Sequence, residues 1–394
     1  MSSQQESTKT WSIEGKGLKL DTAEDVQDFV KEILAFENLE VVVMSGNTVG
    51  IEAGKALAEA FKQKKNLKVM NLSDIFTGRL RSEIPLVLKA ICDALEDKEE
   101  LIELNLSDNA FGPAGAEPMI DFLANNRHLQ VLKLNNNGLG VQGGNLIAKA
   151  LLAAQEKNDA EGRPSSLRTI IAGRNRLENG SSKALAEAFQ AHGTLREIRL
   201  PQNGIRPEGI ELLAKSLASC KDLEVLDLQD NTFTQTGAQA VADALPSWTK
   251  LSVLNIGDCL LGKRGGVAIA EALKSGHECL SELILTYDEI QLDAAEILAD
   301  AISTMKNLRT LELNGNNFPE DSDVVDRIRE ILSENGNEEA LGSLSDMEEL
   351  SDEEDDEEAP SDEEEDENDD EEVEVEEKDT SIDELTEQLA SVKV

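Results

Sequence analysis

A leucine-rich pattern, L-x-x-L-x-L-x-x-N-x-L, recurs along most of this 394-residue chain. Clear and weaker copies together begin at ten leucines: Leu39, Leu67, Leu101, Leu129, Leu167, Leu195, Leu223, Leu251, Leu280 and Leu308. These starts are separated by 28, 34, 28, 38, 28, 28, 28, 29 and 28 residues. A nearly constant period of this length indicates a repeat solenoid, in which each repeat buries its apolar face against its neighbours.

Each repeat reads as a short strand, a turn and a helix. In the repeat that begins at Leu223, we expect Leu226 and Leu228 to point inward, while Asn231 bonds to backbone groups at the turn. Parallel strands lie ~4.8 Å apart whereas packed helices need ~8–10 Å, so the array must bend with its strands inside. The sequence therefore predicts an α/β fold, a leucine-rich repeat horseshoe solenoid of the ribonuclease-inhibitor type, with parallel strands on the concave face and helices outside.

Charge divides the chain into a repeat body and an acidic tail. Residues 346–379 hold 24 acidic residues and one lysine, so they carry −23 of the net charge of −43. Residues 1–38, with a helix expected to open at Asp21, are predicted to cap the N-terminal end. The repeats and a C-terminal capping helix fill residues 39–335. Residues 336–394 are predicted to be a disordered acidic tail that ends in either a short helix or a frayed segment after Ser381.

Composition and motifs exclude several function classes. The repeat body has a net negative charge, which repels the phosphates of nucleic acids, so nucleic acid is not an expected partner. No apolar run reaches 18 residues, so a membrane is not an expected partner either. The four cysteines and three histidines lack metal-ligand spacing. Residues 138–143 match G-x-G-x-x-G, but the equivalent residues 204–209 show that these glycines merely turn strand into helix. We therefore expect no metal, no cofactor and no complete active site. The polar N-terminus favours a cytoplasmic location.

The regular pattern is broken in the second repeat, and such breaks often mark function. This repeat has Ile75 in place of the turn asparagine and exceeds the 28-residue period by six residues. We expect a loop with Phe76, Gly78, Arg79 and Arg81 to bulge from the rim, where strand becomes helix. Its arginines are either solvated charges or partner contacts.

Two further polar clusters fall on the same rim. Asn135 and Asn136 precede the turn asparagine Asn137, and their amides either orient a partner's polar group or are ordinary turn composition. Arg174 belongs to a second basic segment at 173–176. The ten extra residues of the 38-residue repeat are placed at 156–165, as a polar loop without a chemical role.

Acidic residues fall at or near concave strand positions of the later repeats. They are Asp227, Asp230, Asp258, Asp288 and Glu312. A negative concave rim steers a basic partner surface and raises the association rate. The alternative is that these charges serve only solubility.

Several blocks go beyond the generic repeat pattern. They are SDIFTGR at 73–79, LSDNAFGP at 106–113, NNGLG at 136–140, GRNRLENG at 173–180, QNGIRPEGIE at 202–211 and LDLQDNTFT at 226–234. These blocks closely resemble the Ran GTPase-activating proteins of fungi, and the resemblance covers the caps, all ten repeats and the acidic tail. Since the chain ends soon after the tail, we expect it to lack the extra C-terminal domain that attaches the vertebrate form to nuclear pores.

The resemblance implies that the chain stimulates GTP hydrolysis by Ran in its GTP form, alone or together with a Ran-binding protein. In this family a rim asparagine orients the GTPase's own glutamine, which positions the attacking water, and the match places that asparagine at Asn136. The important arginine of the family matches Arg79, which would dock against Ran or hold its loop rather than act as a finger. The chain would be a monomeric regulator and not an enzyme, located in the cytoplasm or near the nuclear envelope. Mg²⁺ and GTP would be held by the partner.

Two rival functions follow from the same features. An acidic leucine-rich repeat scaffold of the histone-binding type also combines repeats with an acidic tail, but its repeats are shorter. An enzyme-blocking scaffold similar to ribonuclease inhibitor would be rich in cysteine, whereas this chain has four cysteines in 394 residues.

Overall fold

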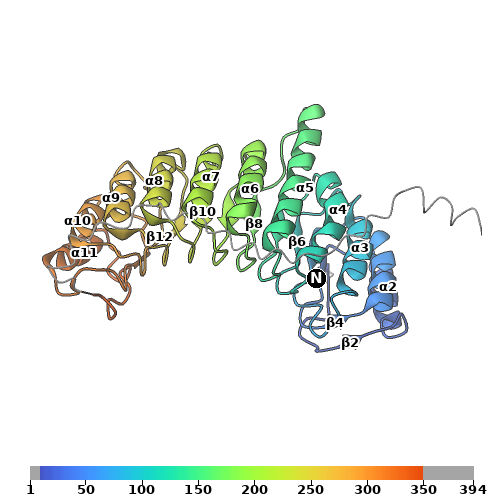
Figure 1. Ribbon diagram of the computed structural model, residues 1–394. Coiled ribbons are helices and arrows are strands. Elements are labelled where there is room, and N and C mark those ends of the chain that lie inside the picture. Colours follow the sequence, from blue (N-terminus) through green and yellow to red (C-terminus); the bar gives the residue numbers. More distant parts are fainter. Residues whose placement is uncertain (1–8, 349–394) are drawn as a thin grey trace, which may run out of the picture. The chain divides into compact units, whose positions relative to one another are not determined.

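One long parallel sheet runs through the computed structural model, which describes residues 9–348 (Figure 1). Its eleven strands are neighbours in chain order, with β1 of the N-terminal segment next to β3. The strands are β1 (Thr10–Ser12), β3 (Val41–Val43), β5 (Val69–Asn71), β6 (Glu103–Asn105), β7 (Val131–Lys133), β8 (Thr169–Ile171), β9 (Glu197–Arg199), β10 (Val225–Asp227), β11 (Val253–Asn255), β12 (Glu282–Ile284) and β13 (Thr310–Glu312). Every one of the ten predicted repeat starts lies two residues before a strand. The predicted α/β leucine-rich repeat solenoid is therefore confirmed.

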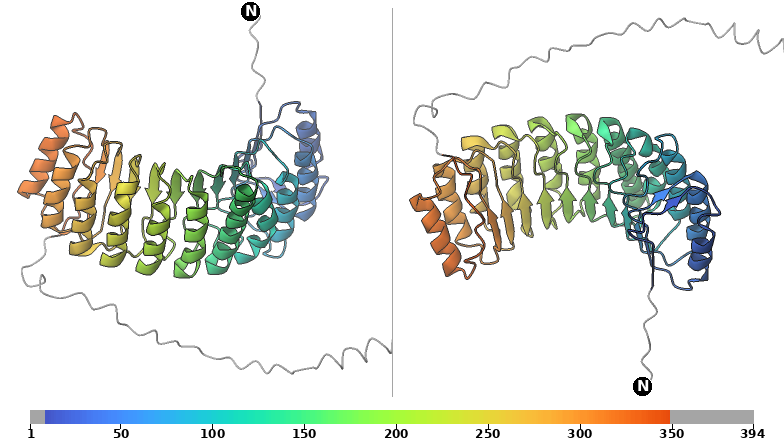
Figure 2. Two further views of the ribbon diagram at one scale, coloured as in Figure 1. Left: turned by 90° about the horizontal axis from the view of Figure 1, so that it is seen from above. Right: turned by 90° about the horizontal axis from the view of Figure 1, so that it is seen from below.

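Helices follow the strands and form the outer layer. They are α1 (Gln27–Ala35), α2 (Ile51–Lys62), α3 (Ile84–Leu95), α4 (Ile120–Asn125), α5 (Gly140–Ala160), α6 (Glu178–His192), α7 (Pro207–Leu217), α8 (Thr234–Ala244), α9 (Gly262–Leu273), α10 (Leu292–Ile302) and α11 (Asp323–Glu334), with 3-10 turns at Pro113–Gly115, Glu117–Met119 and Leu245–Ser247. Figure 2 shows the strands on the inner side of the curve made by the described residues and the helices on its outer side. The wider spacing that packed helices require explains this bend.

The repeat leucines fill the space between the sheet and the helices. Leu226 pairs in register with Ile198 of the preceding strand and Leu254 of the following strand. All three are fully buried, as are Leu223 and Leu228. Because each strand has only three residues, its apolar side chains become buried only when the neighbouring repeats are in place.

Buried asparagines form a hydrogen-bonded ladder along the turns that follow the strands. Asn203 represents the pattern: its side-chain NH₂ donates to the carbonyls of Ala172 and Leu200, and its Oδ1 accepts the backbone N–H of Asn175 at 2.9 Å. The buried members of this ladder are Asn47, Asn109, Asn137, Asn175, Asn203, Asn231 and Asn316. Each amide thus satisfies backbone groups of two neighbouring repeats that the three-residue strands leave unpaired.

The N-terminal segment forms two short strands before its helix, which begins later than the expected start at Asp21. β1 extends the sheet, and β2 (Lys19–Leu20) pairs with β4 (Thr48–Val49). The Asp25 carboxylate accepts the backbone N–H groups of Asp21 and Thr22, so these residues form a turn, and α1 begins only at Gln27. The start at Asp21 was therefore wrong, because local side-chain bonds compete there with helix formation.

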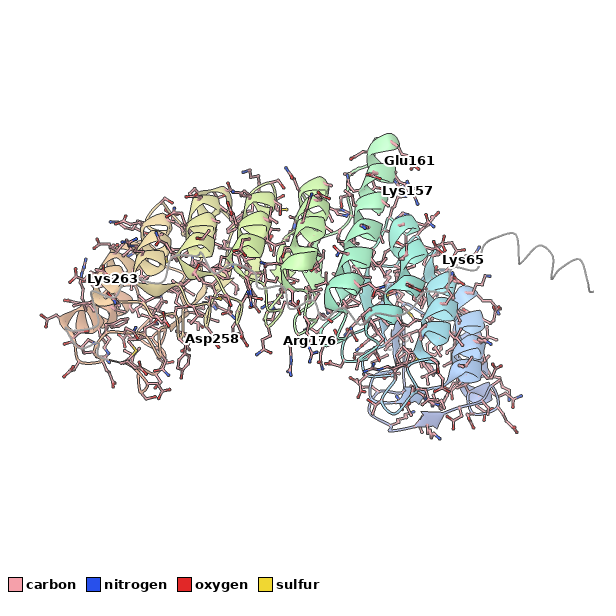
Figure 3. The ribbon with its side chains drawn as sticks, in the orientation of Figure 1. Lys65, Lys157, Glu161, Arg176, Asp258 and Lys263 are labelled. Carbon is pink, nitrogen blue, oxygen red and sulfur yellow. The ribbon has the colours of Figure 1, made fainter. Side chains whose placement is uncertain are left out.

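The ten extra residues predicted as a loop at 156–165 are helical in their first half. α5 continues to Ala160, and Figure 3 shows Lys157 and Glu161 at its far tip. An ion pair of 2.6 Å joins Glu161 to Arg127 of the preceding repeat. The placement of the insertion was right, but a helix extension accounts for half of it.

The C-terminal end is closed by more residues than predicted. α11 covers the expected capping helix, yet residues 336–348 also pack on the last repeat. Leu341 bridges to Leu311 of β13, and Ala340 and Leu344 are buried. The backbone N–H of Glu348 donates to the carbonyl of Asn316. The predicted boundary of the acidic tail at 336 was therefore wrong, since these residues belong to the solenoid. The remainder of that prediction, including the helix after Ser381, lies outside the described residues.

Candidate protein-interaction site

The residue immediately before each ladder position has a left-handed backbone conformation in all ten repeats. In chain order this rim column is Gly46, Asp74, Asp108, Asn136, Arg174, Gln202, Asp230, Asp258, Tyr287 and Gly315, with φ between 48° and 74°. Figure 3 shows Asp258 and Arg176 along the same edge, away from the helices. The column brings three predicted site residues, Asn136, Arg174 and Asp230, into equivalent positions of their repeats.

Asn136 is exposed at the centre of this arrangement. Its backbone N–H donates to the carbonyl of Gly173 at 2.9 Å, and its side-chain Nδ2 donates to Asp108 Oδ1 at 3.0 Å. The next residue, Asn137, is a fully buried ladder member. Asn136 is therefore hydrogen-bonded to both neighbouring repeats while its side chain is exposed to solvent.

Asn135 has a different environment from its neighbour. Its Oδ1 accepts the backbone N–H of Gly173 at 2.6 Å, and its own backbone N–H donates to Ser107 Oγ. The side chain is half-buried. Asn135 thus bonds to both neighbouring repeats, and its contact with a partner stays a prediction.

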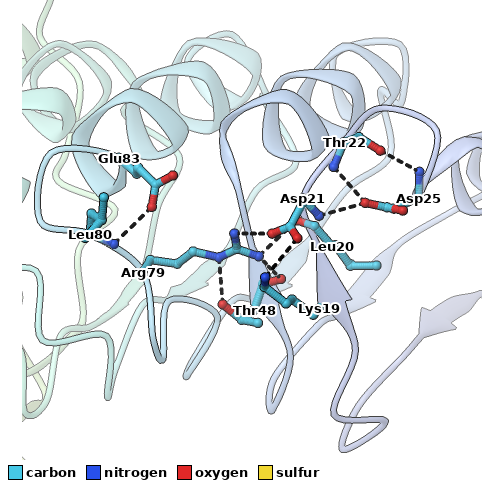
Figure 4. A network of polar contacts seen from close by, with 9 residues as sticks. All are labelled: Lys19, Leu20, Asp21, Thr22, Asp25, Thr48, Arg79, Leu80 and Glu83. Atoms are coloured by element: carbon cyan, nitrogen blue, oxygen red, sulfur yellow. Dashed lines mark hydrogen bonds and ion pairs between the residues drawn. The ribbon is translucent and has the colours of Figure 1, made fainter.

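Arg79 is not the exposed side chain that the sequence predicted. Only 7% of its side chain is exposed, and Figure 4 shows the guanidinium against Leu20 and Asp21 of the N-terminal segment and Thr48 of the first repeat. Nη1 contacts Asp21 Oδ1 at 2.5 Å, Nε contacts Thr48 Oγ1 at 2.8 Å, and Nη2 donates to the carbonyls of Leu20 and Thr48. Arg79, and secondly Lys19, lower the pKa of the Asp21 carboxyl. Arg79 therefore holds the loop to the N-terminal segment.

The loop that carries Arg79 has a buried anchor and an exposed tip. Phe76 is only 3% exposed, which corrects the expectation that it would bulge from the rim. Gly78, with φ of 79°, and Arg81 are exposed, and the intervening Leu80 is 67% exposed. Sequence reasoning missed Leu80, although a leucine in a polar insertion was a usable signal. An exposed leucine beside an arginine is suited to a protein contact.

The predicted acidic surface is only partly acidic and only partly exposed. On the rim, Asp230 accepts a hydrogen bond of 2.7 Å from Gln202. The exposed Arg174 adds a positive charge to the same rim column. Asp227 is buried beside Arg199, and burial raises the pKa of its carboxyl. Asp288 is fully buried in the ladder, so its place on the concave surface was wrong. Asp258 is the exposed member of this group and lies on the rim column, whereas Asp230 and Glu312 are half-buried.

The structure contains one serine–histidine pair that the sequence did not reveal. Ser165 Oγ lies 2.6 Å from His192 Nδ1, and His192 Nε2 lies 3.0 Å from the carbonyl of Leu151. A carbonyl only accepts, so Nε2 carries the proton and Nδ1 accepts from the serine. Burial lowers the pKa of His192 to about 4. Both side chains line a cavity of about 20 Å³, which holds no more than about one water molecule, so the pair is structural.

Across residues 9–348, no three His, Cys, Asp or Glu side chains are grouped as metal ligands would be. In the same region, every helix is too short or too polar to cross a membrane. The evident functional surface of these residues is thus the rim, with Asn136, Arg174, Asp230 and the loop tip at Leu80 and Arg81.

A leucine-rich repeat solenoid with a rigid polar rim is the class of protein that this fold and site define. A family model described as "Leucine Rich repeat" matches residues 101–119, 125–148 and 219–242. The chain is 55% identical over 338 residues to the "Ran GTPase-activating protein 1" of Xenopus laevis, which covers 85% of this chain. It is 46% identical over 313 residues, 79% of this chain, to the "Ran GTPase-activating protein" of Drosophila melanogaster. It is 39% identical over 212 residues, 52% of this chain, to the "Ran GTPase-activating protein 1" of Saccharomyces cerevisiae.

The chain spans little more than half the length of these curated relatives. The shares covered are 58% of the frog protein, 52% of the fly protein and 52% of the yeast protein.

Proposed function

We propose that this chain is a GTPase-activating protein for the small GTPase Ran and thereby supports transport between nucleus and cytoplasm. The observation that carries the proposal is the 55% identity, over 85% of the chain, to a protein named for that activity. The exposed, fixed amide of Asn136 agrees with it, because such a group is suited to orient a polar side chain of a partner. The chain would act as a regulator, without an active site of its own.

In this proposal Asn136 contacts the catalytic glutamine of Ran, and that glutamine positions the attacking water. GTP and Mg²⁺ are held by Ran, so this chain needs no cofactor. Stimulation by such partners supplies ~10³–10⁵ in rate. A preorganised group contributes to the rate because it need not reorient during the reaction.

Arg79 has an indirect role in the proposed complex. Its guanidinium would have to break four contacts within the chain before it reached a phosphate. It is therefore a positioning residue that holds the loop tip at Leu80 and Arg81, where Ran would dock. Arg174 and Asp230 provide further contacts along the rim.

The finer features remain proposals. We propose Ran·GTP as the form that is bound, a monomeric activator, a cytoplasmic or perinuclear location and optional assistance by a Ran-binding protein. The expected fungal type gains no support from the reported identities, which are 39% to the yeast relative and 55% to the frog relative.

Single-turnover hydrolysis tests the proposal. Ran is loaded with γ-labelled GTP, a catalytic amount of this protein is added, and phosphate release is followed with and without it. Stimulation by several orders of magnitude is expected for Ran, and none for an unrelated small GTPase as the control. Binding to Ran·GTP without stimulation would contradict the activator role and favour a scaffold.

A further inference from the structure

The side chain of Asn136 has two chemically different ends, and the proposed function requires a particular one to face the partner. A carboxamide presents an acceptor oxygen on one side and an NH₂ donor on the other. If the amide turns over, donor and acceptor exchange places. A group that orients another side chain therefore needs a neighbour that fixes its own orientation.

Asp108 is that neighbour. Its Oδ1 lies 3.0 Å from Asn136 Nδ2, across adjacent repeats. An ionised carboxylate only accepts hydrogen bonds, so the NH₂ end must face Asp108. The carbonyl oxygen of Asn136 is then left on the opposite side of the amide, available as an acceptor.

The backbone keeps the two side chains together. Asp108 and Asn136 have φ of 62° and 54°, at equivalent positions of neighbouring repeats. The backbone N–H of Asp108 donates to the carbonyl of Asn135 at 2.8 Å, so the turns of the two repeats are joined directly. Sheet register thus sets the distance from carboxylate to amide before any partner binds.

The other nearby carboxylates of the rim column have different partners. Asp74 Oδ1 accepts a hydrogen bond of 2.6 Å from Thr77, and Asp230 accepts from Gln202. A carboxylate–amide contact across adjacent repeats thus occurs at both Asp230–Gln202 and Asp108–Asn136, and the second of these holds the amide that the proposed function uses.

We infer that Asp108 is a positioning residue that sets the orientation of the Asn136 amide, so that Asn136 Oδ1 accepts a hydrogen bond from the NH₂ group of the partner's glutamine. This inference rests on the proposed function. It assigns Asp108 no contact with Ran, and it predicts an effect on the rate of the bound complex rather than on its formation.

The test is Asp108→Asn, which keeps the size of the side chain and tolerates the left-handed backbone. The new amide bonds to either end of Asn136, so the preferred orientation is lost. We expect the hydrolysis rate of Ran at saturating protein to fall about tenfold, while the dissociation constant for Ran·GTP stays within about twofold. The control is Asp243→Asn on α8, an exposed carboxylate that also accepts an amide hydrogen bond, from Gln239, and whose loss should leave both values unchanged.

A double-mutant cycle separates positioning from an independent effect. If Asp108 acts through Asn136, Asp108→Asn should have no further effect in an Asn136→Gly background. Additive losses, or a wild-type rate in Asp108→Asn, would overturn the inference. Asp108→Glu, which retains the carboxylate, should recover part of the rate, and thermal unfolding confirms that each variant is folded.

If the wild-type protein fails to stimulate Ran, the proposed function fails instead. Stimulation that depends on Asn136 but not on Asp108 rejects this inference alone.

Discussion

The left-handed backbone at Asn136 affects how its function must be tested. Non-glycine residues with positive φ are uncommon, and asparagine is among those that tolerate this conformation best. Alanine at this position loses the amide and also introduces backbone strain. A rate loss in Asn136→Ala alone would therefore mix two causes.

We predict that Asn136→Gly, which removes the amide without strain, lowers the saturated hydrolysis rate of Ran by ~10²-fold or more. The affinity for Ran·GTP should change little, because the lost interaction is made mainly in the transition state. The measurement is a titration that determines affinity and saturated rate separately, with Asn136→Ala in parallel. A normal rate in the glycine variant would remove Asn136 from the mechanism.

Arg79 supports a second prediction at the residue scale. Arg79→Ala should lower the free energy of unfolding by roughly 1–3 kcal/mol, since the carbonyls of Leu20 and Thr48 lose charged donors. It should also weaken binding to Ran·GTP, because the loop is no longer held. Arg79→Lys keeps the charge but loses the planar fork, so an intermediate result is expected.

The matched control for Arg79 is Arg81→Ala, which removes an exposed arginine from the same loop and should leave the unfolding midpoint unchanged. An Arg79→Ala protein with normal stability and normal Ran·GTP affinity, but a thousandfold lower saturated rate, would show that Arg79 acts as an arginine finger and not as a positioning residue.

At the scale of elements, one position of the ladder is occupied by a buried acid, Asp288. Asp288 Oδ1 accepts the backbone N–H of Cys259 at 2.8 Å, but Oδ2 is buried without a hydrogen-bond partner. Burial raises the pKa of Asp288 well above its usual range. At the neighbouring ladder position, the side-chain NH₂ of Asn316 donates hydrogen bonds to two backbone carbonyls. A protonated Asp288 has a single O–H and can donate to only one.

We predict that Asp288→Asn stabilises the protein at neutral pH by about 1 kcal/mol, the usual contribution of one hydrogen bond. The folded state keeps the Asp288 proton while the unfolded state loses it above pH ~4, so the wild-type free energy of unfolding falls as pH rises. The variant should show a flatter pH dependence between pH 5 and 8 in denaturant titrations. The reciprocal Asn316→Asp should be destabilised and more sensitive to pH. If neither variant changes this dependence, the buried acid is not the cause.

Sequence reasoning succeeded where a feature repeats and failed where contacts are distant in the chain. The ten leucine starts located every strand of the repeats, because the period itself reports the packing. Nothing local identified Arg79 as buried, since its partners Asp21 and Thr48 lie 58 and 31 residues away. Composition did not separate residues 336–348 from the tail, because their four acidic residues equal in number their four apolar ones, such as Leu344, which packs on the last repeat.

Across the molecule, stability depends on closed ends, because each repeat contacts only its neighbours. Asp21 and Arg79 join the N-terminal segment to the second repeat. At the other end, residues 336–348 cover the edge of β13, and Asp346 accepts hydrogen bonds from Tyr287 and Asn314. The contacts of Asp346 lower the pKa of its carboxyl, with the Tyr287 hydroxyl as the largest cause.

Two truncations should therefore differ. Ending the chain after Glu349 removes most of the acidic tail, and stimulation of Ran should stay within a few-fold at physiological salt, where charges are screened beyond ~8 Å. Ending it after Gly336 also exposes Leu311 and removes buried Leu344, so the thermal midpoint should fall by several degrees. Equal midpoints for the two truncations would show that 336–348 do not close the solenoid. A hundredfold loss of Ran stimulation in the protein that ends after Glu349 would show that the acidic tail takes part in the complex with Ran.

The rim column also limits how this surface can evolve. Its ten residues are four aspartates, two glycines, one asparagine, one glutamine, one arginine and one tyrosine, and none is valine, isoleucine or threonine. β-branched side chains are disfavoured at positive φ, so these positions tolerate only a few residue types, most of them polar. A new partner would have to be selected by rearranging charges and hydrogen-bond donors, not by reshaping an aliphatic surface. Single-base changes among aspartate, asparagine and glycine codons would then be the accessible steps, and the underlying sheet would tolerate each of them.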